Sequence, residues 1–450
     1  MSALRVVGQD SVVPLLGGRV GRYVNLDYAA SAPALEAVRD AVEEFLPWYS
    51  SVHRGAGWKS QLATRAYEAS REAVGAFVAA RADDVVIFTR NTTDAINLLA
   101  SALPDRCQVL TFGTEHHANL LPWRRVKAVC LPTPTSPAEA VAILDDALSA
   151  PSACPRLVSV TAASNVTGEL WPIAALAAVA HQHGARIAVD AAQLAPHAPL
   201  DMTGWDVDYL VFSGHKLYAP YGAGALVGRR DWLAAAPPFL AGGGAVRFVT
   251  TEDVAWADLP DRQEAGSPNV VGAVALAAAC RVLGSYGMDR VAAEEAELER
   301  YASERLSTIP RLTRYSLWDP EHPRIGVLTF NVDGLPYALL AAALAGEHGI
   351  AVRDGCFCAH PMLMRLLGID QCEAMSIRDD LLAHRHVRVP GAVRVSTGVA
   401  TTKADIDAAV KAIGQVVEHG PAWDYSYDEA TGHYLPQPDD RAWPDLAALG

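Results

Sequence analysis

Three short stretches of the sequence place charged or hydroxyl side chains where a predicted buried element begins or ends. Asp190 follows one short apolar run, Lys216 closes Ser213–Lys216 after another, and Thr92 and Thr93 stand at the start of a predicted helix. In open α/β sheets, ligands bind beyond the carboxyl ends of the strands, and the first turn of a helix binds phosphate well. Pyridoxal 5′-phosphate (PLP) needs a lysine for its aldehyde and a carboxylate beside its pyridine nitrogen. The three stretches together therefore predict a PLP site with Lys216 as the covalent anchor.

Each stretch also has a purely structural explanation when it is taken alone. Asp190 could cap a turn, Lys216 could lie on a solvated loop, and Thr92 or Thr93 could be an ordinary helix cap. The joint occurrence in this order and spacing favours the cofactor site.

The elements that position these residues alternate between helical and short apolar patterns over residues 33–235, which predicts a largely parallel sheet with helices on both faces. Thr92 or Thr93 is expected to cap a helix that runs to about Leu103. Strands are predicted at 84–88, 108–112, 126–131, 157–160, 187–189 and 209–212, and further helices from about His117 and over 172–183.

The later chain has a different pattern. It predicts helices near 270–283 and from about 289, strands near 325–331, 350–352 and 393–396, and a last helix that starts at the capping box Thr402-x-x-Asp405. We therefore expect an α/β protein with a large PLP-binding domain over 20–290. A smaller α+β domain would cover 291–420 together with 1–19. The tail 421–450 lacks periodicity and is expected to cover the surface or a partner subunit, or to be partly disordered.

Charge and composition narrow the classes of partner. The net charge is −14 and no Lys/Arg cluster occurs, so nucleic acid is not expected as a partner. No secretory leader and no run of roughly 18 apolar residues is found, which predicts a cytoplasmic protein without a membrane span. The seven cysteines are scattered, which argues against a disulfide framework, and no spacing typical of a metal site occurs.

Several further motifs resemble the class V aminotransferase family of fold-type I PLP enzymes, over roughly residues 20–420. The resemblance is strongest to the group II cysteine desulfurases and selenocysteine lyases. The motifs are Leu26-Asp27-Tyr28-Ala29-Ala30, Val52-His53-Arg54-Gly55, Glu115-His116-His117-Ala118-Asn119, Ser164-Asn165-Val166-x-Gly168, His181-Gln182-His183-Gly184-Ala185 and Glu264-Ala265-Gly266-Ser267-Pro268-Asn269.

The resemblance implies a role for each of these residues. Lys216 would hold the cofactor and transfer protons, Asp190 would keep the pyridine nitrogen protonated, and His116 would stack on the ring. Gln193 would bind the phenolic oxygen, and Asn165 and Arg394 would orient the substrate carboxylate. The phosphate would be bound by Thr92, Thr93, Ser213 and His215, with Ser267 contributed by the other subunit of a homodimer.

The segment 352–361 bears on the reaction. Cys358 matches the desulfurase nucleophile and Arg353 the arginine before it, which implies that sulfur is removed from L-cysteine, or a related amino acid, as a persulfide on Cys358 with release of alanine. A sulfur-acceptor protein would then be a partner. Group II desulfurases usually have two histidines where this chain has Cys356 and Phe357, and the Gly-Cys-Phe-Cys run resembles the desulfurase half of molybdenum-cofactor sulfurases.

Two questions stay open at the level of sequence. Cys356 could relay sulfur, form a regulatory disulfide or pack as a buried residue. The same scaffold also supports aminotransferases, epimerases and cysteine-conjugate β-lyases, which share the first steps at Cα and differ in the fate of the carbanion. A scaffold or regulator without activity is disfavoured, because Lys216, Asp190 and His116 are all present.

Overall fold

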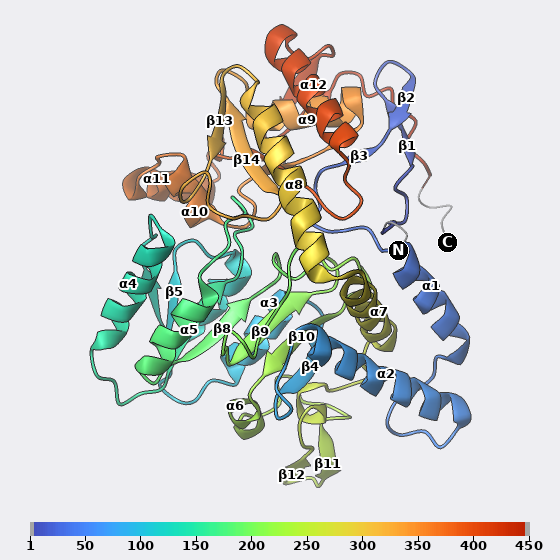
Figure 1. The fold of residues 1–450 in the computed structure, drawn as a ribbon, viewed down its shortest axis with the longest axis vertical. Coiled ribbons are helices and arrows are strands. Elements are labelled where there is room, and N and C mark those ends of the chain that lie inside the picture. Colours follow the sequence, from blue (N-terminus) through green and yellow to red (C-terminus); the bar gives the residue numbers. More distant parts are fainter. Residues whose placement is uncertain (1–3, 446–450) are drawn as a thin grey trace.

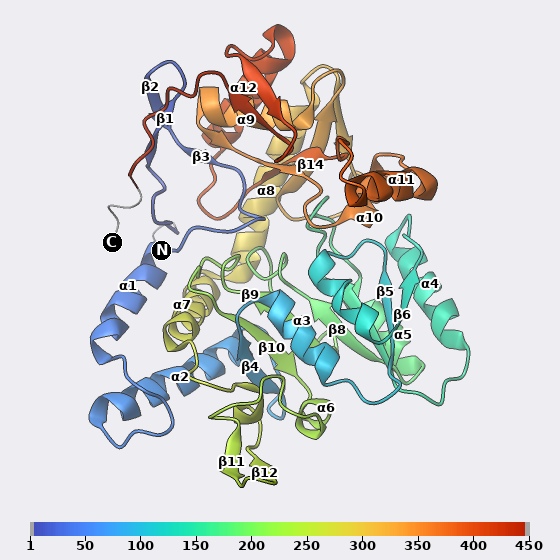
Figure 2. The ribbon, with the colours of Figure 1, turned by 180° about the vertical axis from the view of Figure 1, so that it is seen from behind.

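The computed structural model describes residues 4–445 and is built around a seven-stranded sheet of order β4-β10-β9-β8-β7-β5-β6 (Figures 1 and 2). Residues 1–3 and 446–450, at the ends of the predicted N-terminal segment and tail, lie outside the described residues. Strand β10 is antiparallel to both of its neighbours and the other pairs are parallel, which confirms the predicted mostly parallel sheet. The strands are β4 (Val85–Thr89), β5 (Gln108–Phe112), β6 (Lys127–Leu131), β7 (Arg156–Thr161), β8 (Arg186–Asp190), β9 (Tyr209–Ser213) and β10 (Gly224–Gly228).

Helices cover both faces of this sheet because its strands are apolar on both sides. In β5, Leu110 and Phe112 pack into one core while Val109 packs into the other, as the two-residue period of a strand requires. The first core includes residues of α1, α2, α4, α5 and α7, and the second includes residues of α3 and α6. These helices are α1 (Glu36–Phe45), α2 (Trp58–Phe77), α3 (Thr92–Ser101), α4 (Pro137–Ser149), α5 (Ile173–Gln182), α6 (Arg230–Ala235) and α7 (Val270–Tyr286).

A second, antiparallel sheet of order β13-β14-β17-β16 lies beyond the first. The long helix α8 extends from beside α7, next to the first sheet, to the second sheet (Figure 1). The core of the second sheet contains apolar residues of α8, α9 and α12 together with Val24 and Leu26 from the N-terminal segment. The strands are β13 (Leu312–Tyr315), β14 (Val327–Val332), β16 (Arg353–Gly355) and β17 (Ala392–Ser396), and the helices are α8 (Met288–Ser307), α9 (Tyr337–His348), α10 (His360–Leu366), α11 (Gln371–Leu382) and α12 (Lys403–His419). We propose that the two sheets belong to the two domains predicted above.

Two segments from opposite ends of the chain pack beside α9. Strand β3 (Val24–Asn25) pairs with β15 (Ile350–Ala351), and the backbone N–H of Leu16 donates to the carbonyl of Gly346 at 2.9 Å. The tail forms the hairpin β18 (Tyr425–Asp428) and β19 (His433–Pro436), and β19 packs against α9 of the same chain. Two other small sheets are β1 (Val12–Leu15) with β2 (Arg19–Arg22), and β11 (Val246–Val249) with β12 (Val254–Trp256).

The starts of three helical segments can be compared with their predicted positions. The capping box of Thr402 and Asp405 at the start of α12 is confirmed. The predicted cap of α3 is wrong: Thr92 is the first helical residue, and the side chain of Asn91 accepts from the backbone N–H of Asp94 at 3.0 Å. In place of the helix expected from about His117, the structure has two short 3₁₀ turns, η2 (His117–Asn119) and η3 (Pro122–Arg125).

Within residues 4–445, no single helix combines the length and hydropathy needed to cross a membrane. Helices α7 and α8 meet that requirement only when they are taken together, and they are bent by 79° relative to each other.

Candidate active site

Every predicted site residue except Ser267 lines one cavity of about 580 Å³. Strand β8 ends at Asp190 and β9 at Ser213, so parallel neighbours deliver their functional residues to the same edge of the sheet. The lining residues of this central pocket include Thr92, Thr93, His116, Asn165, Asp190, Gln193, Ser213, His215, Lys216, Arg353, Cys358 and Arg394.

The two charged groups predicted to bind the cofactor ring are both buried. Burial raises the pKa of Asp190, and both a hydrogen bond from the Ala192 backbone N–H at 3.0 Å and the charge of Lys216 oppose that shift. Burial lowers the pKa of Lys216 to about 8, with Asp190 opposing. A side chain at Gly214 would place its Cβ 2.7 Å from the carbonyl oxygen of Ala223, so only glycine allows the tight turn that leads from β9 to Lys216.

Hydroxyl groups meet at the beginning of α3. The backbone N–H of Thr92 donates to Ser213 Oγ at 2.8 Å, and the two hydroxyl oxygens are also 2.8 Å apart. Gly224 allows β10 to approach closely, because a Cβ there would lie 2.9 Å from the Cα of Asn91. Two hydroxyls beside the positive end of a helix dipole suit a phosphate.

The imidazole of His116 is neutral and its tautomer is fixed. Its Nδ1 accepts from the backbone N–H of Ala118 at 3.0 Å, so Nε2 carries the proton. Burial, with the nearby charge of Lys216, lowers the pKa of His116 to about 3. Burial likewise lowers the pKa of His215 to about 4.

A buried carboxyl group that sequence reasoning did not single out supports the backbone at His116. Glu115 accepts from Asn119 Nδ2 at 2.7 Å and from the backbone N–H of Thr161 at 3.1 Å. Burial raises its pKa to about 8. The contacts link the His116 segment to the end of β7, and the only sequence clue was the Glu115–Asn119 motif itself.

A second group of polar residues is held around Arg394. Its side chain is 3% exposed, and its guanidinium donates to the carbonyl oxygen of Asn165 at 2.8 Å and lies 3.4 Å from Asp27. Asp27 also forms an ion pair of 2.9 Å with Arg353 and so links both predicted arginines, a role that the sequence did not reveal. The Nε atom of Arg394 is buried without a hydrogen-bond partner. Burial lowers the pKa of Arg394 to about 10.

The loop that carries Cys358 is fixed to the wall of the central pocket by its backbone. The carbonyl of Cys358 accepts from the backbone N–H of His117 at 2.7 Å, and the carbonyl of Phe357 accepts from Asn165 Nδ2 at 2.7 Å. The Cys358 residue is exposed, whereas Phe357 is buried. His117 also stacks on His360, with ring centroids 5.1 Å apart.

Cys356 lines the same pocket, and it also contacts an apolar cluster. The cluster contains Val166, Phe357, Ala359, Met362, Leu363 and Ala392. This contact supports a packing role for Cys356, while its half-exposed state leaves a chemical role open.

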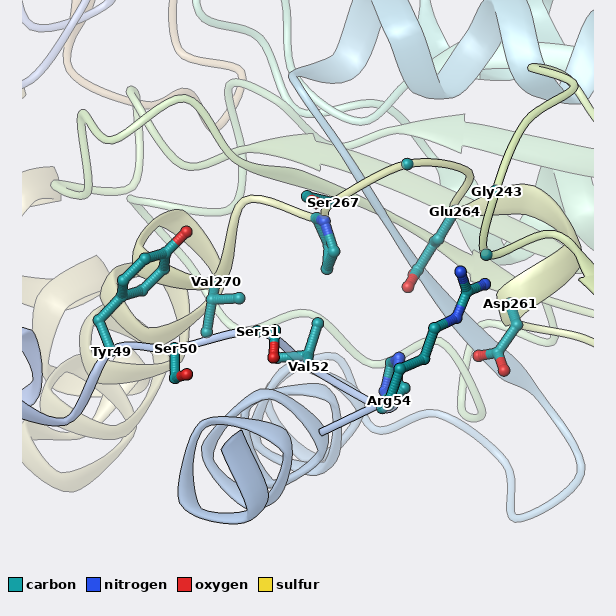
Figure 3. Close-up of a pocket in the computed structure, with 14 residues that line it drawn as sticks. Tyr49, Ser50, Ser51, Val52, Arg54, Gly243, Asp261, Glu264, Ser267 and Val270 are labelled. Carbon is teal, nitrogen blue, oxygen red and sulfur yellow. The ribbon is translucent and has the colours of Figure 1, made fainter. Parts of the chain in front are cut away.

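Ser267 lies in a separate cavity of about 330 Å³, which is shown in Figure 3. The cavity is lined by residues 49–54, by Gly243 and Gly244, and by residues between Asp261 and Val270 at the start of α7. Arg54 extends across it toward Glu264 and Asp261 (Figure 3). A phosphate contact from Ser267 within one subunit is therefore not observed, and the predicted contact across a dimer stays a prediction.

The central pocket fits PLP. The Oε1 atom of Gln193 is buried without a partner, so it can accept from the phenolic group of the cofactor, while its Nε2 donates to the carbonyl of Ala29 at 2.9 Å. Thr92 and Ser213 would hold the phosphate, Asp190 the pyridine nitrogen and Lys216 the aldehyde carbon. No group of three His, Cys, Asp or Glu side chains suited to a metal ion occurs among residues 4–445.

Comparison with known proteins gives a consistent result. Residues 24–409 match the family Aminotransferase class-V. A cysteine desulfurase of Pectobacterium atrosepticum is 36% identical over 419 residues, covering 90% of this chain and 96% of that protein. The crystal structure of the cysteine desulfurase CsdA of Escherichia coli is similar with a TM-score of 0.74 and 32% identity, covering 88% and 95% of the two chains. The apo structure of a cysteine desulfurase from Thermococcus onnurineus has a TM-score of 0.77 and 29% identity, covering 93% and 100%.

Proposed function

The chain belongs to the class V aminotransferase family, and from this membership we propose that it is a PLP-dependent cysteine desulfurase acting on L-cysteine. The observation that carries the proposal is the attachment of the Cys358 loop to the wall of the pocket that contains Lys216. The names of its relatives support the same reaction.

Bound PLP supplies an electron sink next to the substrate amine. The residues of the chain provide the remaining functions. Arg394 has an unused Nε donor for the substrate carboxylate. The amine of Lys216, with a pKa of about 8, can accept and return a proton at Cα near neutral pH. The neutral His116 can donate from Nε2.

Sulfur transfer takes place at Cys358. Its thiolate attacks the substrate sulfur, so an S–S bond forms while the C–S bond breaks. The electron pair of the broken bond stays with the carbon, which is protonated and leaves as alanine. The product on the enzyme is a Cys358 persulfide, from which a thiol reductant or an acceptor protein takes the outer sulfur. The exposure of Cys358 gives such an acceptor access.

The homodimer is also part of the proposal. Ser267 is separated from the central pocket of its own chain, and a partner subunit that brings its own Ser267 to the phosphate would complete the site. All seven cysteines are free thiols, which suits the reducing cytoplasm that we propose as the compartment.

The first test is to incubate the purified enzyme with L-cysteine and dithiothreitol and to measure alanine and sulfide together. Equal amounts of both products are expected. Cys358→Ala should lower both by about 100-fold or more, as removal of a nucleophile does, while the cofactor absorbance is retained. Cys356→Ala is the matched control on the same loop, and near-normal turnover would assign that thiol to packing.

Other outcomes point to the other enzymes of this scaffold. Sulfide with pyruvate and ammonia in place of alanine would identify a β-lyase. No product from L-cysteine, with the cofactor absorbance intact, would contradict desulfuration and favour an aminotransferase or epimerase.

A further inference from the structure

Phe357 contacts both residues that we assign to the substrate carboxylate. The Cζ atom of Arg394 lies over its ring, 4.9 Å from the ring centroid, and Asn165 Nδ2 donates to its carbonyl oxygen at 2.7 Å. Asn165 and Arg394 are in turn joined by the 2.8 Å hydrogen bond from the guanidinium to the Asn165 carbonyl. The three residues form one contact group, although Asn165 is 192 positions from Phe357.

The ring and a carboxylate can contact Arg394 at the same time. An aromatic ring attracts a guanidinium through its π face and takes up none of the N–H groups as hydrogen bonds to oxygen. The Nε of Arg394 has no partner in this arrangement. A substrate carboxylate can therefore bind that donor while the ring holds the guanidinium in place, and a planar donor group gains most from such placement.

The same ring fixes the position of the thiol. Phe357 and Cys358 have φ values of 53° and 54°, in the left-handed region where side chains other than glycine are strained. Such a turn persists only when its surroundings hold it. Three features hold this turn. Phe357 is buried, with 8% of the residue exposed. The carbonyl of Phe357 accepts from the Asn165 side chain, and the carbonyl of Cys358 accepts from the backbone N–H of His117.

We propose that Phe357 is a positioning residue that places Arg394 for the substrate carboxylate and Cys358 for the substrate sulfur. The inference rests on the proposed function, because the carboxylate and the sulfur that Phe357 would serve are the two ends of the proposed substrate, L-cysteine. It concerns a position where this chain differs from the histidine pattern of the group II desulfurases.

The test uses the holoenzyme and two measurements that need no sulfur transfer. The first is the dissociation constant of L-alanine, a carboxylate ligand without sulfur, read from the change in cofactor absorbance. Phe357→Ala should raise this constant about tenfold, the change expected when one desolvated cation–π contact is lost. The second is hydrogen exchange of the backbone amides of residues 355–359, which should become about tenfold faster or more in the same variant because the loop loses its anchor.

Control variants separate positioning from general packing. Leu363→Ala truncates a fully buried side chain of the same apolar cluster, and Leu363 is not among the residues that line the central pocket, so L-alanine binding should stay within about twofold of the wild-type value. Phe357→Tyr should restore both properties. If Phe357→Ala does not fold, Phe357→Leu keeps the apolar volume without the aromatic ring and should show the same loss of L-alanine affinity.

Wild-type affinity in the Phe357→Ala variant, a loss no greater than in Leu363→Ala, or unchanged exchange of residues 355–359 would overturn the proposal. Failure of the wild-type enzyme to form alanine from cysteine would instead contradict the proposed function. The two failures are distinguishable, because neither L-alanine binding nor amide exchange depends on desulfuration.

Discussion

At the scale of single residues, burial sets the protonation of the groups that would bind PLP. Lys216 is the clearest case: burial lowers its pKa to about 8 from the usual 10.5, and the nearby Asp190 limits the shift. At pH 7 about a tenth of the lysine amine is therefore uncharged, which is the form that attacks an aldehyde and is far more than at the usual pKa.

This pKa leads to a prediction for cofactor uptake by the apoenzyme. Below about pH 8 the amine is mostly protonated, so the rate of PLP uptake, followed by absorbance, should rise about tenfold per pH unit and level off above about pH 8. Asp190→Asn removes the charge that raises the Lys216 pKa, so the midpoint should move to lower pH. A midpoint near 10.5 in the wild type would contradict the prediction.

The sequence predicted the residues to which we assign chemistry, and all of them except Ser267 line one pocket, but it did not predict the residues that hold them in place. Lys216 and Asp190 could be found because each follows an apolar run that is visible locally. Asp27 contacts Arg394, which is 367 positions away, and the Phe357 carbonyl accepts from Asn165, which is 192 positions away. No local sequence pattern encodes such contacts.

At the scale of elements, the connection between the two sheets depends on Gly168. Its φ is +84°, and a Cβ there would lie 2.8 Å and 2.9 Å from the carbonyl oxygens of Ile325 and Val327. This close approach places the Asn165 segment against β14 and beside Arg394 on β17.

Gly168→Ala should therefore lower the free energy of unfolding by about 2 kcal/mol or more, through backbone strain plus the clash, and should weaken L-alanine binding. Denaturant midpoints measure the first effect and cofactor absorbance the second. Gly184→Ala is the matched control: its φ is +66°, but nothing lies within 4 Å of the added Cβ, so only strain of about 1 kcal/mol is expected. Equal losses of unfolding free energy in the two variants would show that the structure relieves the clash at residue 168 without cost, and would contradict the prediction.

Most strands of the large sheet could be predicted, since buried parallel strands are short continuous apolar runs. Strand β10 was missed because Gly224 and Gly228 begin and end it, and glycine normally indicates a turn. Here the glycines are needed because neighbouring backbone lies too close for a side chain. The cap of α3 was misplaced by one or two residues, because Asn91, Thr92 and Thr93 are all good capping residues.

At the scale of the whole molecule, the proposed dimer predicts that subunits share their sites. Ser267→Asp would repel the cofactor phosphate of the partner, whereas Lys216→Ala inactivates the site of its own chain. In a heterodimer of these two variants, one of the two sites has both normal residues. Random mixing makes half of the dimers heterodimers, so activity should return to about a quarter of the wild-type value.

The control for this mixing experiment pairs Lys216→Ala with Asp190→Asn. Both residues line the same pocket of one chain, so every site in the mixed dimers lacks one of them and no activity should return. Sedimentation measurements would confirm that the subunits associate. Recovery in the control, or none in the Ser267→Asp mixture, would exclude a shared site.

The packing of the N-terminal segment against α9 has a consequence for the order of events during synthesis. Strand β3 pairs with residues 350–351, and the Gly17 backbone N–H donates to the Asp440 carboxylate at 3.1 Å. Ribosomes add roughly 5–20 residues per second, so the first strands wait on the order of tens of seconds for their partners. The large sheet, whose strands lie between residues 85 and 228, emerges completely within that interval. Residues 17–25 are thus synthesised before the large sheet but reach their final place after it.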